Sequence, residues 1–431
     1  MSKYHPLNVS IFEQNRQRFM EAMVPNSLAV FTSNPQIAEN GDALYAYKAN
    51  SDLVWLTGIT QEKTMLVIYP DNQNGQGKCI LFIQHPNELL EKWNGHLLRK
   101  DEAKAISGID DIYYIEEFDA MFKVWMHHVD YCYLNTNEND RLDPGSLRTD
   151  LDFIRTVKAA YPLHQYLRAA RLMKSLRAVK TPAEIEVIKE AVRITDKAFR
   201  RVLGFLKPGV HEFEIEAEIT HEFLRNRATR HAYHPIIASG GNACILHYVD
   251  NNQECKDGDL LLMDFGAEYG NYNADLSRTI PVNGKYTPRQ KEVYNACLNV
   301  HRFCASILKP GINYADYIDQ VNAFMNEELI KLGLYTAEEA ANVPAGEEPL
   351  YRRYFYHGIG HHIGLDVHDV GTRNQPIEEG MYFTIEPGIY IAEENMGVRI
   401  ENNYWITKDG NIDLYGEIPI TVEEIEQAMS K

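Results

Sequence analysis

The pattern of apolar and polar residues predicts an α/β domain in the first part of the chain. Short runs rich in β-branched and aromatic residues predict strands at 27–33, 64–70, 78–83 and 130–136, and a helical pattern at 101–109 lies between the last two. A helix is also predicted near Ser10, which has the spacing of a capping box with Glu13. Strands that alternate with helices are typical of an α/β fold, which we place at residues 1–173.

A long amphipathic helix opens the second domain, residues 174–431. Thr181, Pro182 and Glu184 have the spacing of an N-cap, a first helical position and the end of a capping box. Apolar residues then recur at helical spacing on one face, at Ile185, Ile188, Val192, Phe199 and Val202. One side of this helix is therefore predicted to face a core.

Two stretches of the second domain resemble each other. FLKPGVHEFEIEAEI (205–219) and ILKPGINYADYIDQV (307–321) share Leu-Lys-Pro-Gly followed by an aliphatic residue. Pro and Gly commonly end helices, so coincidence is one explanation. A duplicated half-domain is the other, and it predicts that each copy is followed by a comparable chemical feature.

The first copy is followed by the apolar stretch LLLMDFGAEYGNYNADLSRTI (260–280), which Asp264 and Asp275 interrupt. A two-residue turn at Tyr269-Gly270 would place these aspartates opposite each other, with Cβ atoms about 4.5–5.5 Å apart. Two ionised carboxylates at that distance repel each other, and burial raises the cost. Either they share a proton or a cation lies between them.

The second copy is followed by a hairpin of the same design, residues 381–407. Glu386 and Glu401 interrupt its two apolar runs, and a turn near Glu393-Glu394 would bring them opposite each other. Between the two hairpins lies HGIGHHIGLDVHDVG (357–371), which carries His357, His361, His362 and His368. Each half of the domain thus offers one pair of acids, with imidazoles nearby.

Four carboxylates and at least one imidazole form a donor set for two divalent metal ions. Oxygen-rich ligation favours manganese, with iron or cobalt as alternatives, over a zinc site of histidine and cysteine. Two adjacent ions can hold a hydroxide and polarise a carbonyl, which is hydrolytic chemistry. The competing explanation is that the acids only pair with arginines such as Arg278 and Arg399.

Composition excludes several other classes. A formal net charge of -18 disfavours nucleic acid and anionic membranes as partners. The six cysteines form no CxxC pair, and no apolar run has the length of a signal peptide or a membrane span, so we expect a cytoplasmic protein with reduced thiols. The chain has no HExxH, GxSxG or phosphate-loop motif.

The hairpin segments MDFGAEYGNYNADLSRT, TIEPGIYI and VRIEN, with the histidine segment 357–371, resemble the metal-binding signature of the pita-bread metallopeptidases. The resemblance is closest to the Xaa-Pro aminopeptidase (aminopeptidase P) group. NSLAVFTS and YKANSDLVWLTG resemble that group's amino-terminal domain. The resemblance implies an α/β (α+β) protein, in which an N-terminal α/β domain precedes a pita-bread domain with duplicated halves and an antiparallel sheet.

The resemblance also implies a ligand set. Two divalent ions, manganese or else cobalt, iron or zinc, would be bound by Asp264, Asp275, His361, Glu386 and Glu401. Asp275 and Glu401 would bridge the ions, and a bridging hydroxide would attack the carbonyl that precedes proline. Glu386 would shuttle the proton of that hydroxide.

Further positions match residues around the reacting bond in this family. His368 and His247 would lie beside the tetrahedral intermediate and the scissile bond, and His357 would line the substrate pocket. Arg399 would orient the ligands through an ion pair, and Tyr390 would contact the substrate. We expect a structural role for His362. Trp93 in LLEKWNGHLL could match a tryptophan of this family that reaches a neighbouring subunit's site, but we assign it to packing.

The implied activity is that of a Xaa-Pro aminopeptidase, which acts on peptides with proline at the second position. Prolidase is the alternative, but its members tend to carry a longer insert between His368 and Glu386, with an arginine for the dipeptide's carboxylate; Arg373 could serve instead. Creatinase-like enzymes and non-catalytic pita-bread binding modules lack the full ligand set. The resemblance further suggests a homodimer or homotetramer.

Overall fold

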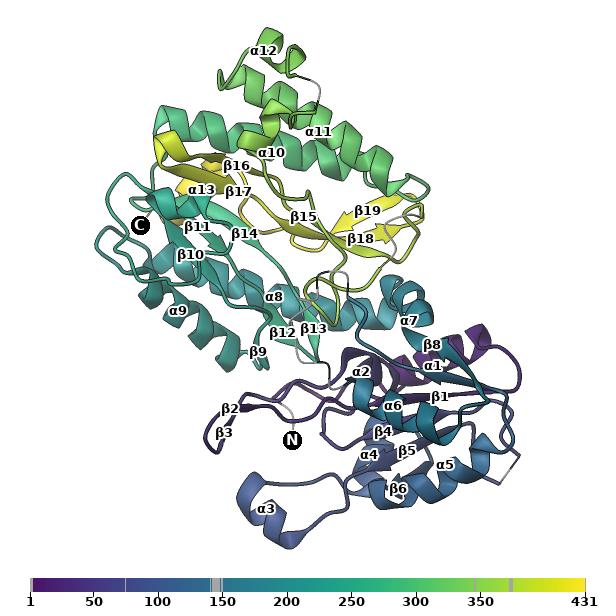
Figure 1. Ribbon diagram of the computed structural model, residues 1–431. Coiled ribbons are helices and arrows are strands. Elements are labelled where there is room, and N and C mark those ends of the chain that lie inside the picture. Colours follow the sequence, from purple (N-terminus) through teal and green to yellow (C-terminus); the bar gives the residue numbers. More distant parts are fainter. Residues whose placement is uncertain are drawn as a thin grey trace. The chain divides into compact units, whose positions relative to one another are not determined.

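The structure is a computed structural model that describes residues 3–73, 75–139, 141, 148, 150–344, 346–371 and 375–430. The chain forms two compact units, Pro6–Arg177 and Ala178–Lys431, and the second includes the segment Met1–His5 (Figure 1). Among the described residues, no helix combines the length and the apolar character needed to cross a membrane.

The first unit is built on a six-stranded sheet with the order β6-β5-β4-β1-β7-β8. The central strand β1 (Ser27–Thr32) runs antiparallel to β4 (Met65–Ile68) and parallel to β7 (Tyr131–Leu134). The α/β prediction is confirmed, although β6 and β8 were not predicted. The remaining elements are α1 (Ser10–Ala22), β2 (Ala38–Asn40), β3 (Ala43–Leu44), α2 (Ser51–Thr57), β5 (Cys79–Ile83), α3 (Glu88–Asn94), α4 (Lys100–Ser107), β6 (Asp111–Tyr114), a 3-10 turn (Ile115–Glu117), α5 (Phe118–Met126), α6 (Asp150–Ala160), β8 (Gln165–Arg168) and α7 (Ala169–Ala178).

Two local predictions for this unit are wrong. Ser10 and Glu13 form no capping box, because the cap position is Val9 and Asn8 Oδ1 instead accepts a hydrogen bond from the Ser10 amide at 3.0 Å. Trp93 does not pack, since it is 81% exposed on α3, a helix with no buried residue.

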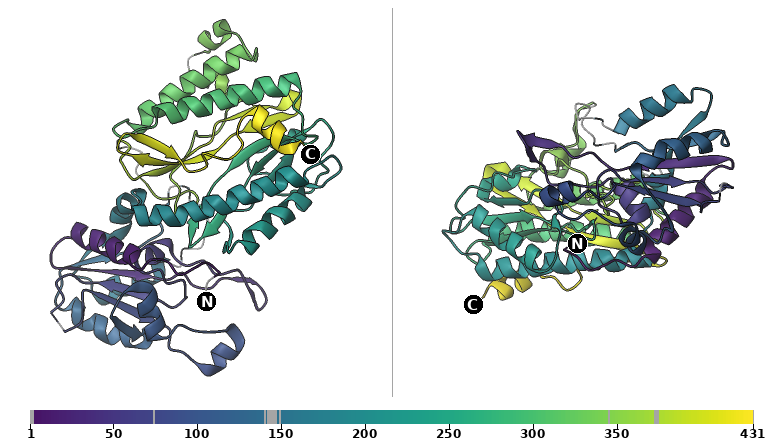
Figure 2. Two further views of the ribbon diagram at one scale, coloured as in Figure 1. Left: turned by 180° about the vertical axis from the view of Figure 1, so that it is seen from behind. Right: turned by 90° about the horizontal axis from the view of Figure 1, so that it is seen from below.

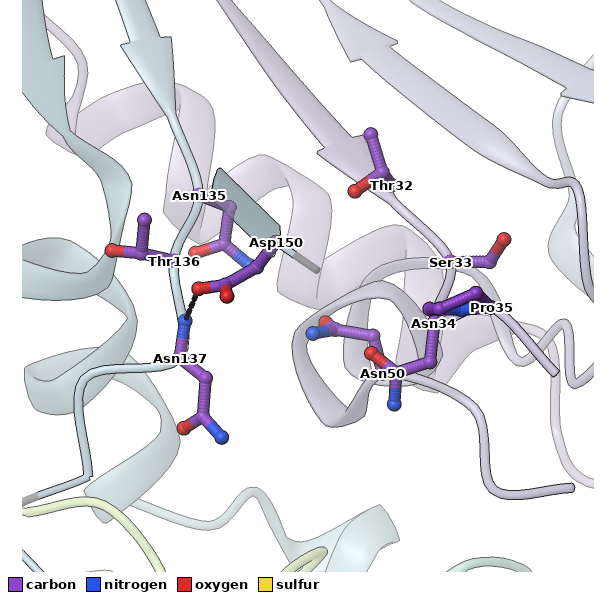
Figure 3. Close-up of a pocket in the computed structure, with 9 residues that line it drawn as sticks. All are labelled: Thr32, Ser33, Asn34, Pro35, Asn50, Asn135, Thr136, Asn137 and Asp150. Carbon is purple, nitrogen blue, oxygen red and sulfur yellow. Dashed lines mark hydrogen bonds between the residues drawn. The ribbon is translucent and has the colours of Figure 1, made fainter. Parts of the chain in front are cut away.

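A polar depression lies where β1 and β7 end (Figure 3). After β1 the next strand of the sheet, β4, lies on one side, whereas after β7 the next strand, β8, lies on the other side. A point where the strand order changes direction in this way is a frequent ligand site in open α/β sheets. Two of the lining side chains are already engaged: Asp150 accepts from the Asn137 amide at 3.0 Å, and the Asn50 side chain caps α2. Among the described residues that line the depression, Asn135 Oδ1 is buried without a hydrogen-bond partner, but Asp150 is the only acid and there is no histidine, so no catalytic cluster is formed.

In the second unit, the strands lie between two pairs of helices (Figures 1 and 2). The pairs are α8 (Pro182–Phe205) with α9 (Glu212–Arg225), and α10 (Pro288–Ile307) with α11 (Tyr314–Lys331). The other elements are β9 (Arg230–His231), β10 (Ile236–Ser239), β11 (Leu260–Asp264), β12 (Ala267–Tyr269), β13 (Tyr272–Asn273), β14 (Ser277–Pro281), α12 (Ala337–Ala341), β15 (Tyr382–Ile385), β16 (Gly388–Ile391), β17 (Met396–Arg399), β18 (Asn402–Thr407), β19 (Gly410–Asp413), α13 (Val422–Met429) and 3-10 turns at Gly240–Cys244, Leu350–Arg353 and Ala392–Glu394.

The two Leu-Lys-Pro-Gly copies have the same structural role. Gly209 and Gly311 have left-handed φ values of 90° and 87°, which glycine adopts without strain. The Gly209 amide donates to the Cys255 carbonyl at 2.9 Å, and the Gly311 amide donates to the Ile377 carbonyl at 2.8 Å. In each half this turn is thus tied to the chain that leads towards an acidic hairpin, which confirms the duplicated architecture.

Helix α8 begins as predicted. The Thr181 hydroxyl accepts from the Glu184 amide at 3.3 Å, and the Glu184 carboxylate accepts from the Thr181 amide at 2.7 Å. The predicted apolar face is confirmed, because Ile185, Ile188, Val192, Phe199 and Val202 are all buried. Helix α8 packs against β12 and β13, the strands at the turn of the first acidic hairpin.

The register of the first hairpin differs from the prediction by two residues. The turn lies at Gly270-Asn271, whose φ values are 57° and 68°, so Tyr269 pairs with Tyr272 and Asp264 with Ser277. Turns with two positive φ values favour glycine and asparagine, whereas tyrosine is poorly suited to them. Because side chains alternate with a period of two, the shift leaves Asp275 on the same face as Asp264.

The register of the second hairpin is confirmed. Gly388 pairs with Arg399, and Ile391 pairs with Met396, across a turn centred on Glu393-Glu394. Ile385 pairs with Asn402 in the same register, although β15 and β18 belong to a different sheet. Glu386 and Glu401 therefore face each other at the break between the two sheets.

We predict that Gly266→Ala destabilises the protein. A Cβ atom at Gly266 would lie 1.8 Å from the Ala274 carbonyl oxygen, so the crossing next to Asp275 has no room for a methyl group. We expect a loss of about 1–3 kcal/mol in the free energy of unfolding, measured by urea denaturation. Gly204→Ala is the matched control, since a Cβ there meets nothing within 4 Å inside α8, and it should stabilise slightly. Equal stability of the two variants would contradict the prediction.

Candidate metal centre

The acids of the predicted ligand set lie at interruptions of the hairpins. Asp264 is the last residue of β11, and Asp275 lies between β13 and β14. Glu386 directly follows β15, and Glu401 lies between β17 and β18. Asp275 and Glu401 are almost completely buried, while Asp264 and Glu386 are half-buried.

His361 joins these acids from the histidine segment. One ligand atom each of Asp275, His361 and Glu401 lies within 4.8 Å of the others. His361 Nε2 lies 3.6 Å from Asp275 Oδ2 and 3.6 Å from Glu386 Oε1. Its other ring nitrogen, Nδ1, is 2.9 Å from the His362 carbonyl oxygen and so carries the proton of the neutral ring. The Nε2 lone pair is therefore directed at the carboxylates, as a metal ligand requires.

Asp264 is held by two neighbours. Arg399 Nη2 donates to Asp264 Oδ2 at 2.6 Å. The Tyr233 hydroxyl lies within hydrogen-bond distance of both Asp264 Oδ1 and Asp275 Oδ1. Tyr233 was not predicted from the sequence. It lies just before β10, so its proximity to the acids follows only from the pairing of β10 with β11, in which Ile236 faces Asp264.

Arg399 connects both acid pairs. Its Nε donates to the Ser277 hydroxyl at 3.0 Å, and that hydroxyl donates to Glu401 Oε2 at 2.8 Å. Its Nη1 donates to the Tyr390 hydroxyl at 2.9 Å. A single guanidinium thus reaches Asp264 directly and Glu401 through Ser277. This arrangement fits the predicted role of Arg399 in orienting the ligands.

Arginines alone do not neutralise the cluster. The buried Arg278 donates to the carbonyl oxygens of Ser277, Glu401 and Pro419 and to Asn402 Oδ1. Arg399 makes its direct ion pair with Asp264. Two buried acids, Asp275 and Glu401, have no arginine partner of this kind among the ion pairs of the described residues.

The electrostatics indicate a missing positive charge. Burial, together with the neighbouring charge of Asp264, raises the pKa of Asp275 well above its usual value of 3.8. Burial, together with the charge of Asp275, raises the pKa of Glu401 well above 4.5. Within the described part of the chain, Glu401 Oε1 is buried without a hydrogen-bond partner. A buried acceptor that faces other acids fits a divalent cation, so the residues present fit a metal site.

The remaining histidines surround the cluster in different ways. His357 Nε2 lies 2.7 Å from the Tyr390 hydroxyl, and burial followed by the charge of Arg399 lowers the pKa of His357 to about 3. The His368 ring meets the His361 ring nearly edge-on, with centroids 4.3 Å apart. His362 is buried and packs on Phe383 at 4.2 Å, as a structural residue would.

His247 stands apart from this group. Its side chain is exposed, and no hydrogen bond or ion pair of the described residues joins it to the acids. Its loop is clamped by the fully buried Glu212, which accepts from the Ser239 amide at 2.8 Å, the Tyr248 hydroxyl at 2.8 Å and the Gln253 amide at 2.9 Å. His247 is therefore a free imidazole on an anchored loop.

The geometry defines a candidate centre for divalent metal ions, and the comparisons with known proteins identify the class of protein. Residues 186–408 match Metallopeptidase family M24, and residues 12–133 match the aminopeptidase P N-terminal domain. The chain is similar to the Xaa-Pro aminopeptidases of Haemophilus influenzae (32% identity) and Escherichia coli (33% identity), with 97% of each chain covered. The solved Pseudomonas aeruginosa aminopeptidase PepP superposes with a TM-score of 0.88 at 30% identity, with 98% of each chain covered.

The chain belongs to metallopeptidase family M24. Within this family it is a metallo-aminopeptidase of the aminopeptidase P group, a hydrolase that uses divalent metal ions. The predicted fold, an N-terminal α/β domain followed by a pita-bread domain, is confirmed by the same likeness.

We predict that Tyr233→Phe weakens metal binding. The hydroxyl group contacts one oxygen of Asp264 and one of Asp275, and partners that orient ligands in this way typically contribute about 10–100-fold to metal affinity. Calorimetric titration of metal-free protein with Mn²⁺ measures the change. Tyr335→Phe is the control, because it removes a buried hydroxyl that donates to Asn326. The same affinity in both variants would rule out this role for Tyr233.

We predict that metal binding strengthens as the pH rises. The pKa values of Asp275 and Glu401 are raised in the folded protein. Without metal, these groups therefore contribute to the free energy of unfolding below about pH 4, and this contribution is lost as the pH rises towards their folded-state pKa values. A divalent ion needs the ionised forms, so its binding releases protons. The metal-induced increase in Tm should be larger at about pH 8 than at about pH 6. A larger increase at the lower pH would contradict this.

Proposed function

We propose that this enzyme hydrolyses the N-terminal Xaa-Pro bond of peptides by means of two divalent metal ions. The observation that carries the proposal is the buried cluster of Asp275, His361 and Glu401, in which Glu401 Oε1 has no hydrogen-bond partner among the described residues. The likeness to Xaa-Pro aminopeptidases over 97% of the chain supports the choice of substrate. Manganese is our preferred metal because oxygen donors dominate the set.

Asp264, Asp275, His361, Glu386 and Glu401 would hold the two ions, with Asp275 and Glu401 shared between them. When bound, such ions would supply activation of the attacking water and polarisation of the scissile carbonyl. Asp275 and Glu401 suit the shared positions because they are the most deeply buried acids of the set.

The chain's own residues would manage the protons and the substrate. Glu386 is half-buried, so it can exchange a proton with the attacking water and with the leaving proline nitrogen. The lowered pKa of His357 keeps its imidazole neutral, and its Nε2 is already bonded to Tyr390, which makes it a positioning group for the pocket wall. His368, beside His361, and the free imidazole of His247 are the candidates to donate to the oxyanion.

We propose domains at residues 1–173, of the aminopeptidase P N-terminal type, and 174–431, the catalytic pita-bread domain. A homodimer or homotetramer is the assembly that the family resemblance suggests. The short segment between His368 and Glu386 favours an aminopeptidase that accepts longer peptides over a prolidase. Arg373, the residue that could bind a dipeptide's carboxylate, lies outside the described residues.

A peptide series tests the proposal. Metal-free protein is loaded with Mn²⁺, Co²⁺ or Zn²⁺ and given Ala-Pro-Ala, Ala-Pro and Ala-Ala-Ala. We expect release of the first alanine from Ala-Pro-Ala, with a higher kcat/KM than for Ala-Pro, and no cleavage of Ala-Ala-Ala. A preference for Ala-Pro would identify a prolidase, and cleavage of the proline-free peptide would remove the assigned specificity.

Paired variants link turnover to the cluster. Asp275→Asn keeps the shape of the side chain but removes the charge, so turnover should fall below detection and less metal should be bound. Asp409→Asn is the control, since Asp409 is an exposed acid in the turn between β18 and β19. Unchanged turnover in Asp275→Asn would exclude the proposed mechanism.

A further inference from the structure

A buried ion pair lies next to the histidine segment and is not part of the ligand set. Lys180 Nζ lies 2.9 Å from Asp369 Oδ2, and both side chains are only 1% exposed. The two residues are 189 positions apart in the sequence. Removing two charges from water is costly, so such a pair contributes little net stability unless its geometry is good. The role of this ion pair therefore lies in the residues that it holds in position.

Asp369 closes the loop that carries three of the histidines, His361, His362 and His368. Its amide donates to the His362 carbonyl oxygen at 2.8 Å, and the same oxygen lies 2.9 Å from His361 Nδ1. His368 directly precedes Asp369, and its ring rests against the ring of His361. The position of the Asp369 backbone therefore sets the position of the His368 ring relative to His361.

Lys180 holds Asp369 from a fixed point of the catalytic unit. The Lys180 amide donates to the Gly380 carbonyl at 2.8 Å, and Val179 forms a bridge with Met381, which leads into β15. Thr181, the next residue, caps α8. The backbone that carries the Lys180 side chain is thus tied both to the strand that leads to Glu386 and to the start of the long helix.

Gly364 makes room for the pair. A Cβ atom at this position would lie 2.2 Å from Asp369 Oδ2 and 2.8 Å from Lys180 Nζ. The Gly364 carbonyl also accepts from the Asn273 amide at 2.8 Å, two residues before Asp275. The loop, the ion pair and the first acidic hairpin are consequently packed at one point.

We infer that Lys180 is a positioning residue for the reaction: through its ion pair with Asp369 it fixes the loop 361–369, so that the His368 imidazole stays beside His361 at the metal centre. The inference rests on the proposed function, because it assumes that His368 acts on the reacting bond. Small displacements of such a group can cost about 100-fold in rate. Lys180 should therefore govern kcat more than KM or metal content.

The test compares Lys180→Met, the neutral pair Lys180→Met/Asp369→Asn and the control Lys189→Met, which removes an exposed lysine that pairs with Glu186 on α8. Each manganese-loaded protein is assayed for kcat and KM on Ala-Pro-Ala, for bound metal by atomic emission and for Tm. We expect Lys180→Met to lose about 10–100-fold in kcat, with KM and metal content close to wild type. Lys189→Met should match wild type.

The neutral pair separates positioning from stability. It also removes the buried carboxylate charge whose ion pair Lys180→Met breaks, so its Tm should recover towards wild type, while kcat stays low and a crystal structure shows the His361 and His368 rings farther apart than 4.3 Å. Recovery of kcat together with Tm, or a kcat loss that follows metal loss, would overturn the inference. Inactive wild type would instead refute the proposed function, and the inference with it.

Discussion

The rest of the catalytic unit depends on charge neutrality within a cluster of acids. Two unit charges about 4 Å apart at a protein site repel by about 4 kcal/mol when the effective dielectric constant is near 20. Asp264, Asp275, Glu386 and Glu401 converge there, and Arg399 supplies one positive charge. The raised pKa values of Asp275 and Glu401 express this deficit. Divalent cations would reverse it, because a dication stabilises the ionised form of the acids that burial disfavours.

Duplication explains how so many acids reach one place. Each half supplies a helical hairpin and then a strand hairpin that is divided between two sheets. Glu386 and Glu401 lie at such a division, where the backbone ladder is interrupted, and Asp275 lies at the corresponding division of the other half. The halves are not equivalent, however, because the arginine that pairs with Asp264 of the first half, Arg399, belongs to the second half. The centre is thus held together by contacts between the halves.

The sequence predicted the chemistry better than the geometry. The facing positions of Glu386 and Glu401 were right because the turn at 392–395 is symmetric about the predicted centre. Asp264 and Asp275 were placed two residues out of register, because the turn type depends on which residues tolerate positive φ, and Gly270-Asn271 do so better than Tyr269-Gly270. Tyr233 and Ser277 could not be predicted, since their contacts with the acids arise from strand pairings that no local pattern encodes.

The three histidines nearest the cluster show how one residue type acquires different chemistry. His361 has its tautomer fixed by the His362 carbonyl oxygen and directs a lone pair at the acids. His357 is kept neutral by burial and by the nearby charge of Arg399, and it is engaged by Tyr390. His368 is defined by its packing on His361 and by the loop that Asp369 closes. Spacing within HGIGHHIGLDVHDVG does not distinguish these roles. The distinction comes from the folded conformation of the loop and, at His357, from the remote residues Tyr390 and Arg399, so the three roles exist only within the folded domain.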